Sequence, residues 1–291
     1  MSTVRIGDYA IDKVVELELP FAPARAFFPD LTEEMLQACQ RELPAGQLTA
    51  DGLLNMSYHA FLLRTGRHTI LVDTCCGNGK DRAARPAFHK LDTRFLCVLA
   101  EAGVAPEQVD FVMCTHLHWD HVGWNTRLVD GRWVPTFPNA RYIVSRTEYE
   151  FWDDAYRRGD PSIHCRSFAD SVLPVKRADQ VVVVADDHEL DRGIVLEPCF
   201  GHSPGHVVIN IASGGQRAVA IGDVIHHQIQ LRFPAMSTMA DTDRYRARQT
   251  RTALIDKHAD TDTIFLPAHF ITPTAGRIRR AAAGFRYAPL D

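Results

Sequence analysis

Residues 115–121, Thr-His-Leu-His-Trp-Asp-His, constrain the chain more than any other stretch of its sequence. They directly follow the mainly apolar run 109–114, which predicts a buried strand. The stretch contains four potential metal donors: His116, His118, Asp120 and His121. The first two donors alternate, so their imidazoles would point the same way from an extended segment. The last two stand where the chain must turn toward a helix. Imidazole and carboxylate donors at a strand end predict a divalent-cation site, and the alternative is a polar loop with unrelated histidines.

Three later strands each deliver one more donor at their end. The donors are His202, within the turn Gly-His-Ser-Pro-Gly-His, then Asp223 and His269. Any one of them alone is more simply explained as a surface histidine or as an aspartate that caps a helix. Together with residues 115–121, their repeated design favours a single shared metal site.

Hydrophobic periodicity predicts a mixed α/β chain. Strands are expected at 4–19, 57–63, 68–73, 109–114, 141–145, 181–185, 194–199, 206–212, 218–221 and 264–267. Helices are expected at 31–36, 95–102, 146–156 and 243–258, with a last helix after Pro273. Two successive runs of strands and helices, each with a histidine-bearing loop, favour one domain over residues 1–291, built from two β-layers with outer helices. Segment 20–50, with its prolines and phenylalanines, is expected to form an N-terminal arm.

This set of motifs resembles the metallo-β-lactamase superfamily, and the resemblance extends from about residue 57 to His269. It implies a four-layer αββα sandwich with two metal ions at one edge. The implied ligands are His116, His118 and His202 for the first ion, Asp120, His121 and His269 for the second, and Asp223 as the bridge. Asp73 matches a family position whose side chain supports the metal ligands without binding the metal itself. Where this chain has Cys75, the family usually has glycine.

The ligand set suggests hydrolysis. Two cations about 3.5 Å apart can share a water and lower its pKa, so a metal-bridging hydroxide would attack the substrate carbonyl. Asp120 could carry the proton to the leaving group. Within the superfamily the chain is most similar to the N-acyl-homoserine lactonase-like and methyl-parathion-hydrolase-like enzymes. The lactonases have a tyrosine at the substrate carbonyl where this chain has His226, which could donate a hydrogen bond instead; the alternative is a histidine bonded to backbone.

We therefore predict a metal-dependent hydrolase of a small-molecule lactone or ester. The alternatives are a phosphotriester or thioester hydrolase of the same fold, and a non-catalytic metal-binding member. The predicted cofactor is a pair of divalent ions, zinc first, with manganese or iron as alternatives. Aromatic residues suit an apolar substrate, and a pocket is predicted at Phe27, Phe28, Trp119, Trp124 and Phe233.

The bulk composition limits the partners. A net charge of −4 gives no broad attraction for nucleic acid or for an anionic membrane. No apolar run approaches a membrane span, and the first residues lack the apolar core of a signal peptide. Seven scattered cysteines fit reduced thiols in the cytoplasm, which is the predicted location. Exposed apolar surface on the arm near Phe27 and Phe28 would favour a homodimer.

Overall fold

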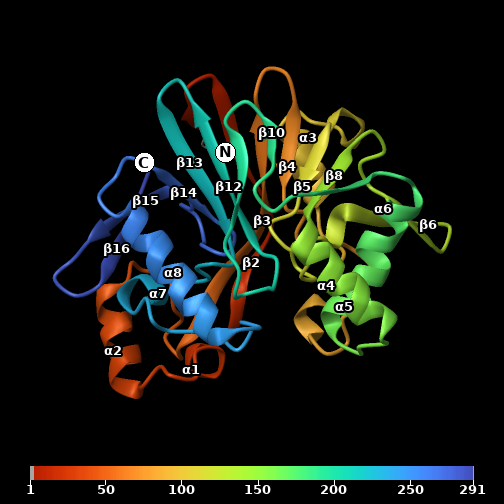
Figure 1. Ribbon diagram of the computed structural model, residues 1–291. Helices are drawn as coiled ribbons and strands as arrows, with labels where there is room; N and C mark the ends of the chain where they lie inside the picture. The colour runs from red at the N-terminus through yellow and green to blue at the C-terminus, as the bar shows by residue number, and fades with distance from the viewer. Residues whose placement is uncertain (1–2, 291) are drawn as a thin grey trace. The chain divides into compact units, whose positions relative to one another are not determined.

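The structure is a computed structural model that describes residues 3–290. The chain folds into two compact units. The first unit consists of Met1–Leu17 and Tyr58–His188, and the second of Glu18–Ser57 and Glu189–Asp291. Strands β2 (Tyr9–Pro23) and β3 (Leu53–Arg64) each continue from one unit into the other (Figure 1). One domain for the whole chain stays a prediction.

The first unit contains most of a seven-stranded mixed sheet with the order β1-β2-β3-β4-β5-β8-β9. Its other strands are β1 (Val4–Ile6), β4 (Thr69–Val72), β5 (Phe111–Met113), β8 (Arg141–Ser145) and β9 (Val181–Val184). Strands β4, β5, β8 and β9 pair in parallel, so their carboxyl ends meet at one edge. The helices are α3 (Phe95–Glu101), α4 (Arg146–Arg157), α5 (Ile163–Ser167) and α6 (Leu173–Arg177), with the π-helix η4 (Phe168–Val172) between the last two. A separate hairpin joins β6 (Thr126–Val129) to β7 (Arg132–Pro135).

The second unit is built on another seven-stranded sheet, in chain order from β10 to β16. The strands are β10 (Glu189–Asp191), β11 (Ile194–Pro198), β12 (Val207–Ser213), β13 (Gln216–Gly222), β14 (Ile264–Pro267), β15 (Gly276–Arg280) and β16 (Phe285–Pro289). Only the β13–β14 pair in this sheet is parallel, and β13 and β14 precede the predicted donors Asp223 and His269. The helices are α1 (Ala24–Phe27), α2 (Glu33–Glu42), α7 (Ile229–Arg232) and α8 (Arg244–His258). Each unit has its own cluster of buried apolar side chains.

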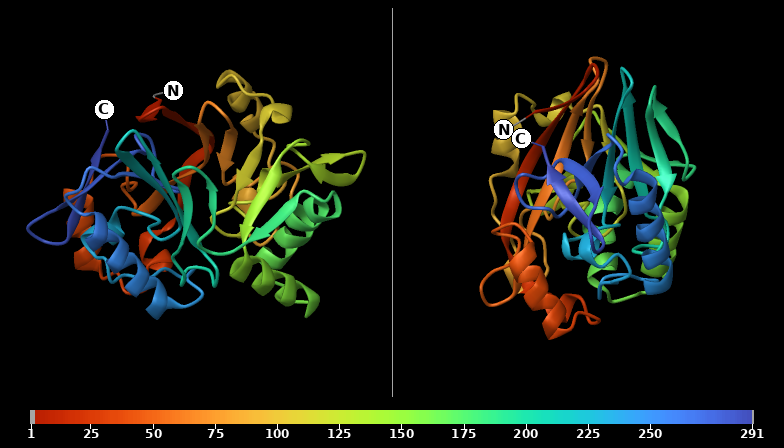
Figure 2. Two further views of the ribbon diagram at one scale, coloured as in Figure 1. Left: turned by 45° about the horizontal axis from the view of Figure 1, so that its top comes forward. Right: turned by 90° about the vertical axis from the view of Figure 1, so that its left-hand side faces the viewer.

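The mixed α/β fold class is confirmed, with sheet and helix in both units. The predicted strand 264–267 and the predicted helix 243–258 match β14 and α8 almost residue for residue. The last predicted helix, after Pro273, is wrong: β15 and β16 form an antiparallel hairpin there, drawn in dark blue in Figure 2. Side chains in β15 alternate, with Ile278 in the core between the less buried Arg277 and Arg279. This period of two is the pattern of a half-buried strand.

Residues 120–121 also lead into a different structure from the predicted helix. A turn closes there, because His121 N donates to the carbonyl of His118, and only the short 3₁₀ helix Gly123–Asn125 follows. The chain then enters β6. The expected strand-to-helix junction is therefore a strand-to-turn junction.

Segment 20–50 carries α1 and α2 and belongs to the second unit. The expectation of exposed apolar surface around Phe27 and Phe28 is wrong, since these side chains are 9% and 0% exposed. The Phe27 ring packs edge-on against the rings of Phe21 and His226, with centroids 5.4 Å apart in both pairs. The homodimer stays a prediction without this support.

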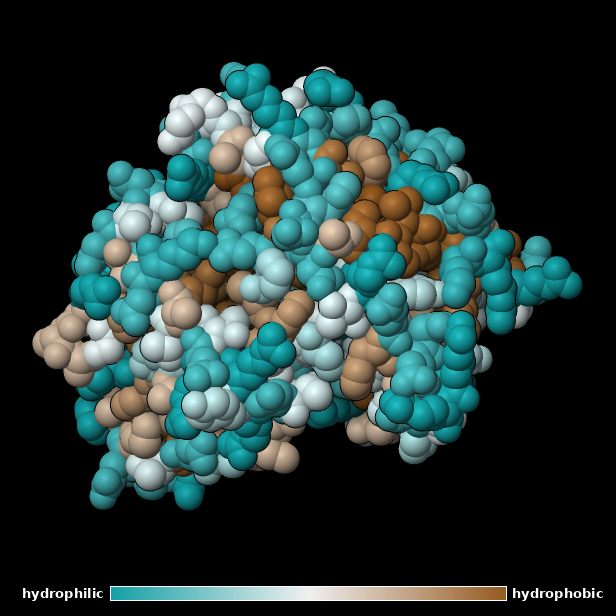
Figure 3. All heavy atoms as spheres, in the orientation of Figure 1, coloured by the Kyte–Doolittle hydropathy of each residue, from teal (hydrophilic) through white to brown (hydrophobic). Residues whose placement is uncertain are grey.

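No helix within residues 3–290 is long and apolar enough to cross a membrane. Hydrophilic side chains cover most of the face drawn in Figure 3, and apolar side chains gather in smaller areas of it. All seven cysteines are free thiols, and only Cys97 is exposed.

A buried cation in the first unit gives a testable pH dependence. The ammonium group of Lys80 has no solvent exposure and donates to Thr126 Oγ1 at 2.6 Å and to the carbonyl of Asp170 at 3.1 Å. Asp170 lies in the π-helix, and its carboxylate also accepts hydrogen bonds from both terminal nitrogens of Arg82. Burial lowers the pKa of Lys80 from 10.5 to about 7, and the carboxylate of Asp170 only partly opposes this.

Between pH 7 and 10.5 the unfolded chain therefore holds a proton on Lys80 that the folded chain has lost. This contribution raises the free energy of unfolding as pH rises, by about 1.4 kcal/mol per pH unit. The contribution of Lys80 is isolated by urea unfolding of the wild type and of Lys80→Met at a series of pH values. The other titratable groups are present in both proteins, so their effects cancel in the difference between the two free energies of unfolding. We expect the wild type to gain stability relative to Lys80→Met as pH rises above 7. A difference that does not change with pH would contradict the lowered pKa.

Candidate metal centre

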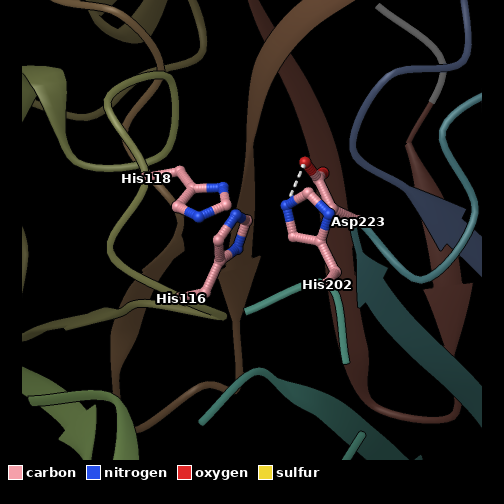
Figure 4. Close-up of side chains that lie close together, drawn as sticks. All are labelled: His116, His118, His202 and Asp223. Atoms are coloured by element: carbon pink, nitrogen blue, oxygen red, sulfur yellow. Dashed lines mark ion pairs between the residues drawn. The ribbon is translucent and has the colours of Figure 1, made fainter. Parts of the chain in front are cut away.

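The donors of the first unit come from the loop that follows β5. His116, His118 and His121 are buried, while Asp120 is partly exposed. The ring centroid of His116 lies 4.4 Å from that of His118 and 4.1 Å from that of His121. Figure 4 shows the rings of His116 and His118 beside each other. The structure thus gathers the three predicted imidazoles of this loop into one cluster.

Asp73, at the end of β4, sets the orientation of this loop. Its Oδ1 accepts the backbone N–H of Thr115 at 2.8 Å, and its Oδ2 accepts the Thr115 hydroxyl at 2.8 Å. The same Oδ2 lies 2.9 Å from Nδ1 of His121, and Thr115 Oγ1 lies 3.1 Å from Nδ1 of His116. Because the Nδ1 proton of each imidazole has an oxygen acceptor, the lone pair stands on Nε2, the tautomer that a metal ligand needs.

Two side chains that the sequence did not single out also hold this loop. Glu148 is fully buried in α4 and accepts the backbone N–H of Leu117 at 2.9 Å and the indole N–H of Trp152 at 2.8 Å. His164, from α5, lies with its ring centroid 3.8 Å from that of His118. A glutamate on an aromatic-rich helix gives no sequence signal of this role, because charged helix residues are usually solvated.

The turn after β4 contains Cys75, the position where the family resemblance implies glycine. Cys75 adopts a left-handed conformation with φ of 51°, the conformation that favours glycine. Glu16 holds the turn, because its buried carboxylate accepts the backbone N–H groups of Cys76 and Gly77 and the indole N–H of Trp124. Burial raises the pKa of Glu16, and these hydrogen bonds oppose the rise.

The donors of the second unit converge on one carboxylate. Nε2 of His202 lies 3.2 Å from Oδ2 of Asp223, the contact dashed in Figure 4. Nε2 of His269 lies 3.0 Å from Oδ1 of Asp223. The Nδ1 atoms point away: that of His202 lies 3.1 Å from Oδ1 of Asp241, and that of His269 lies 3.1 Å from the carbonyl of Ser57.

This arrangement fits a bound cation. In their neutral forms, His202 and His269 would donate their Nδ1–H groups to Asp241 and to the Ser57 carbonyl. Their Nε2 lone pairs would then face the negative carboxylate of Asp223. Lone pairs and a carboxylate at 3.0–3.2 Å repel one another unless a positive charge, either a metal ion or a second ring proton, lies between them. Neutral imidazoles and a carboxylate are also the donors that zinc prefers. The second unit alone therefore has the chemistry of a metal site.

Asp241 is a further residue of the site, and no sequence motif marks it. Burial alone would raise its pKa, but the hydrogen bond from His202 and the positive groups around it lower the pKa to about 2. Oδ2 of Asp241 accepts the backbone N–H of Thr238 at 2.9 Å, and a terminal nitrogen of the buried Arg251 lies 4.0 Å away. The ligand atoms of His202, His226 and Asp241 lie within 4.8 Å of one another. Asp241 lies in a loop without a recognisable motif, so only the fold places it behind His202.

The remaining predicted residues lie in different surroundings. Nε2 of the buried His226 lies 3.2 Å from Oδ2 of Asp223. Burial lowers the pKa of His226, and Asp223 opposes this. Phe27 packs against the His226 ring and Phe28 packs behind Phe27, whereas Phe233 is partly buried after α7.

In the first unit, Trp119 packs with Tyr58 and Phe88. Trp124 stacks on Phe95 in the apolar core, which gives it a packing role.

Comparison with known proteins gives one family match and several relatives. The model of the Metallo-beta-lactamase superfamily matches residues 56–269. The N-acyl homoserine lactonase AiiA of Bacillus thuringiensis subsp. kurstaki is 30% identical over 171 residues, which span 55% of this chain and 60% of the lactonase. A probable metallo-hydrolase of Mycobacterium bovis is 24% identical over 265 residues, 78% of each chain.

Two solved structures have similar folds over nearly their whole lengths. The hydrolase AbOPH, in the beta lactamase superfamily, has a TM-score of 0.81 at 24% identity, covering 99% of this chain and 97% of its own. AidC, a dizinc quorum-quenching lactonase in complex with a product, N-hexanoyl-L-homoserine, has a TM-score of 0.80 at 21% identity. That match covers 100% of this chain and 97% of AidC. At these identities the likeness is one of fold.

Proposed function

The chain belongs to the metallo-beta-lactamase superfamily, and on that basis we propose that it is a dinuclear metal-dependent hydrolase that opens a lactone or cleaves a carboxylic ester. The observation that carries the proposal is the convergence of the Nε2 atoms of His202 and His269 on Asp223, at 3.2 and 3.0 Å. Their Nδ1 protons are already bonded elsewhere, so the arrangement calls for a cation.

The ligands are assigned by combining the donors of both units. His116, His118 and His202 would hold one ion, Asp120, His121 and His269 would hold the other, and Asp223 would contribute to both. Zinc is the first choice, because imidazole and carboxylate donors suit it and because AidC is a dizinc enzyme. When bound, such a pair of ions would supply an activated water and would polarise the scissile carbonyl.

The protein's own side chains complete the chemistry. Asp120, the partly exposed carboxylate of the first unit, carries the proton to the leaving oxygen. His226 donates a hydrogen bond to the substrate carbonyl oxygen, since its ring is buried beside Asp223 and is held by the backbone bond from its N–H to Gln230 Oε1 at 2.8 Å. Asp73 and Asp241 keep His121 and His202 in the metal-binding tautomer.

The substrate class follows from the apolar surroundings of His226 and from the relatives. Phe27 contacts the imidazole of His226 directly, so an apolar acyl or alkyl group is favoured next to the reacting carbonyl. The lactonase AiiA and the lactonase AidC point to the same class. Phosphotriester or thioester hydrolysis and non-catalytic metal binding are the alternatives.

The test combines metal content with activity. We expect elemental analysis of the purified protein to give about two equivalents of divalent metal. We also expect hydrolysis of a lactone or an aryl ester, lost on chelation and restored by zinc. Preference for a phosphotriester or a thioester would select that alternative. Two equivalents without turnover on any of the four classes would favour a metal-binding protein, and less than one equivalent after reconstitution would overturn the site.

Asp73→Asn tests the support of His121. The amide replaces one carboxylate oxygen by an N–H₂ group, so it cannot accept from the Thr115 backbone and from the His121 ring together. We expect chelator competition to show a metal affinity about ten- to a hundredfold lower. Asp179→Asn is the matched control, because Asp179 has the same left-handed φ of 58° but is exposed. Equal affinities in both variants would contradict the assigned role of Asp73.

A further inference from the structure

A cavity of about 440 Å³ lies in the second unit, and none of the predicted donors lines it. The end of α2, helix α7 and the turn between β15 and β16 form its wall. Figure 1 draws α2, α7 and β16 in the same part of this unit. The volume lies within the range of small-molecule sites in proteins.

The charged side chains of the cavity leave a net positive charge. Its lining contains one carboxylate, Glu42, and two guanidinium groups, Arg232 and Arg286. Nε of Arg232 donates to Glu42 at 2.8 Å, and its Nη1 donates to the carbonyl of Ala283 at 3.0 Å. A guanidinium group has five N–H donors, so Arg232 retains donors after these two bonds. Arg286 is exposed and adds the excess charge.

The rest of the lining is mainly apolar. Leu43 and Leu231 contribute aliphatic surface, and Phe285 and Tyr287 contribute aromatic surface. The hydroxyl of Tyr287 already donates to the carbonyl of Thr274 at 2.6 Å, so its ring is fixed in place. A cationic corner beside an apolar wall matches a molecule that has a carboxylate and a short hydrocarbon chain.

We propose that this cavity, between Glu42, α7 and the β15–β16 turn, is a binding site for a small amphipathic carboxylate. Binding of the carboxylate in this cavity would be independent of the hydrolysis proposed above.

Occupancy of the cavity would be felt at His226 through α7. Gln228, Leu231 and Arg232 line the cavity. Gln230 of the same helix is fully buried and does not line it. Gln230 Oε1 accepts the backbone N–H of His226, and its Nε2 donates to the carbonyl of Met236 at 3.0 Å. A ligand that tightens α7 would thus slow hydrogen exchange at the amide of His226.

The probe is hexanoate, added to the metal-loaded protein and followed by isothermal titration calorimetry, with hexan-1-ol as the uncharged comparison. We expect hexanoate to bind more tightly than the alcohol. Arg286→Gln should weaken hexanoate binding about threefold, and Glu42→Gln should strengthen it about threefold, because each changes one partly screened charge. Ala282→Trp places an indole in the cavity from an exposed position and should abolish binding.

Arg277→Gln is the matched control, because Arg277 lies on the same hairpin but outside the cavity, where its Nε donates to the carbonyl of Asp262, and it should leave hexanoate binding unchanged. Loss of folding would weaken hexanoate binding in both variants. It therefore cannot explain an affinity that rises in Glu42→Gln and falls in Arg286→Gln. Hexanoate binding that survives Ala282→Trp would overturn the proposal by placing the ligand elsewhere, for example at the metal centre. Equal affinity for hexan-1-ol, or no binding at millimolar concentration, would overturn it as well.

Discussion

Asp120→Asn should lower the hydrolysis rate about 10²- to 10⁴-fold, the range lost when a positioned acid or base is removed. The amide keeps the size of the side chain and one oxygen, but it cannot take up a proton at neutral pH. Asp120 is partly exposed at the end of its loop, so the fold should tolerate the change. The measurement is the rate of lactone hydrolysis together with the metal content and the unfolding temperature of each protein.

Asp130→Asn serves as the control for Asp120→Asn, since Asp130 is an exposed residue of the turn between β6 and β7. Its hydrolysis rate should equal that of the wild type. If Asp120→Asn and Asp130→Asn hydrolyse a panel of lactones equally fast, Asp120 is not the proton carrier. If Asp120→Asn loses metal as well as activity, its role as a ligand outweighs its role in proton transfer.

Gly123→Ala should lower the free energy of unfolding by about 3 kcal/mol or more, because overpacking against fixed backbone cannot be relieved by a rotamer change. A Cβ atom at Gly123 would lie 1.9 Å from the carbonyl oxygen and 2.0 Å from the carbonyl carbon of Cys76. The backbone N–H of Gly123 donates to the carbonyl of Cys75 at 2.7 Å, so the two segments cannot separate without loss of this bond. Urea unfolding of the metal-free proteins measures the change.

Gly131→Ala is the matched comparison in the same unit. Gly131 has a positive φ of 76°, but a Cβ atom there would meet nothing within 4 Å. Its replacement should cost only about 1–2 kcal/mol for the left-handed conformation. Equal losses for Gly123→Ala and Gly131→Ala would mean that the close approach at Cys76 relaxes freely.

The sequence was most informative where a motif is local. The alternation of His116 and His118 after an apolar run is visible in a few residues, and their ring centroids lie 4.4 Å apart in the structure. By contrast, Glu148 and Asp241 act at a distance, through Leu117 and His202, from helix α4 and from a loop. No local pattern marks such residues, because their role depends on tertiary packing that periodicity does not report.

The wrong helix after Pro273 has a related cause. Arginine and alanine are good helix formers, so residues 277–283 favour a helix on propensity alone. The fold decides otherwise, because Ile278 completes the core of the second unit and β15 pairs with β16. Long-range pairing outweighs a propensity difference of a few tenths of a kcal/mol per residue.

The Nδ1 contacts of His116, His121, His202 and His269 have a kinetic consequence. Folding itself settles which nitrogen of each ring carries the proton, through Thr115, Asp73, Asp241 and the Ser57 carbonyl. In each unit, rings fixed in this way would offer Nε2 to a metal ion. Within each unit, binding of a metal ion should therefore require no transfer of a proton between the two nitrogens of a ring.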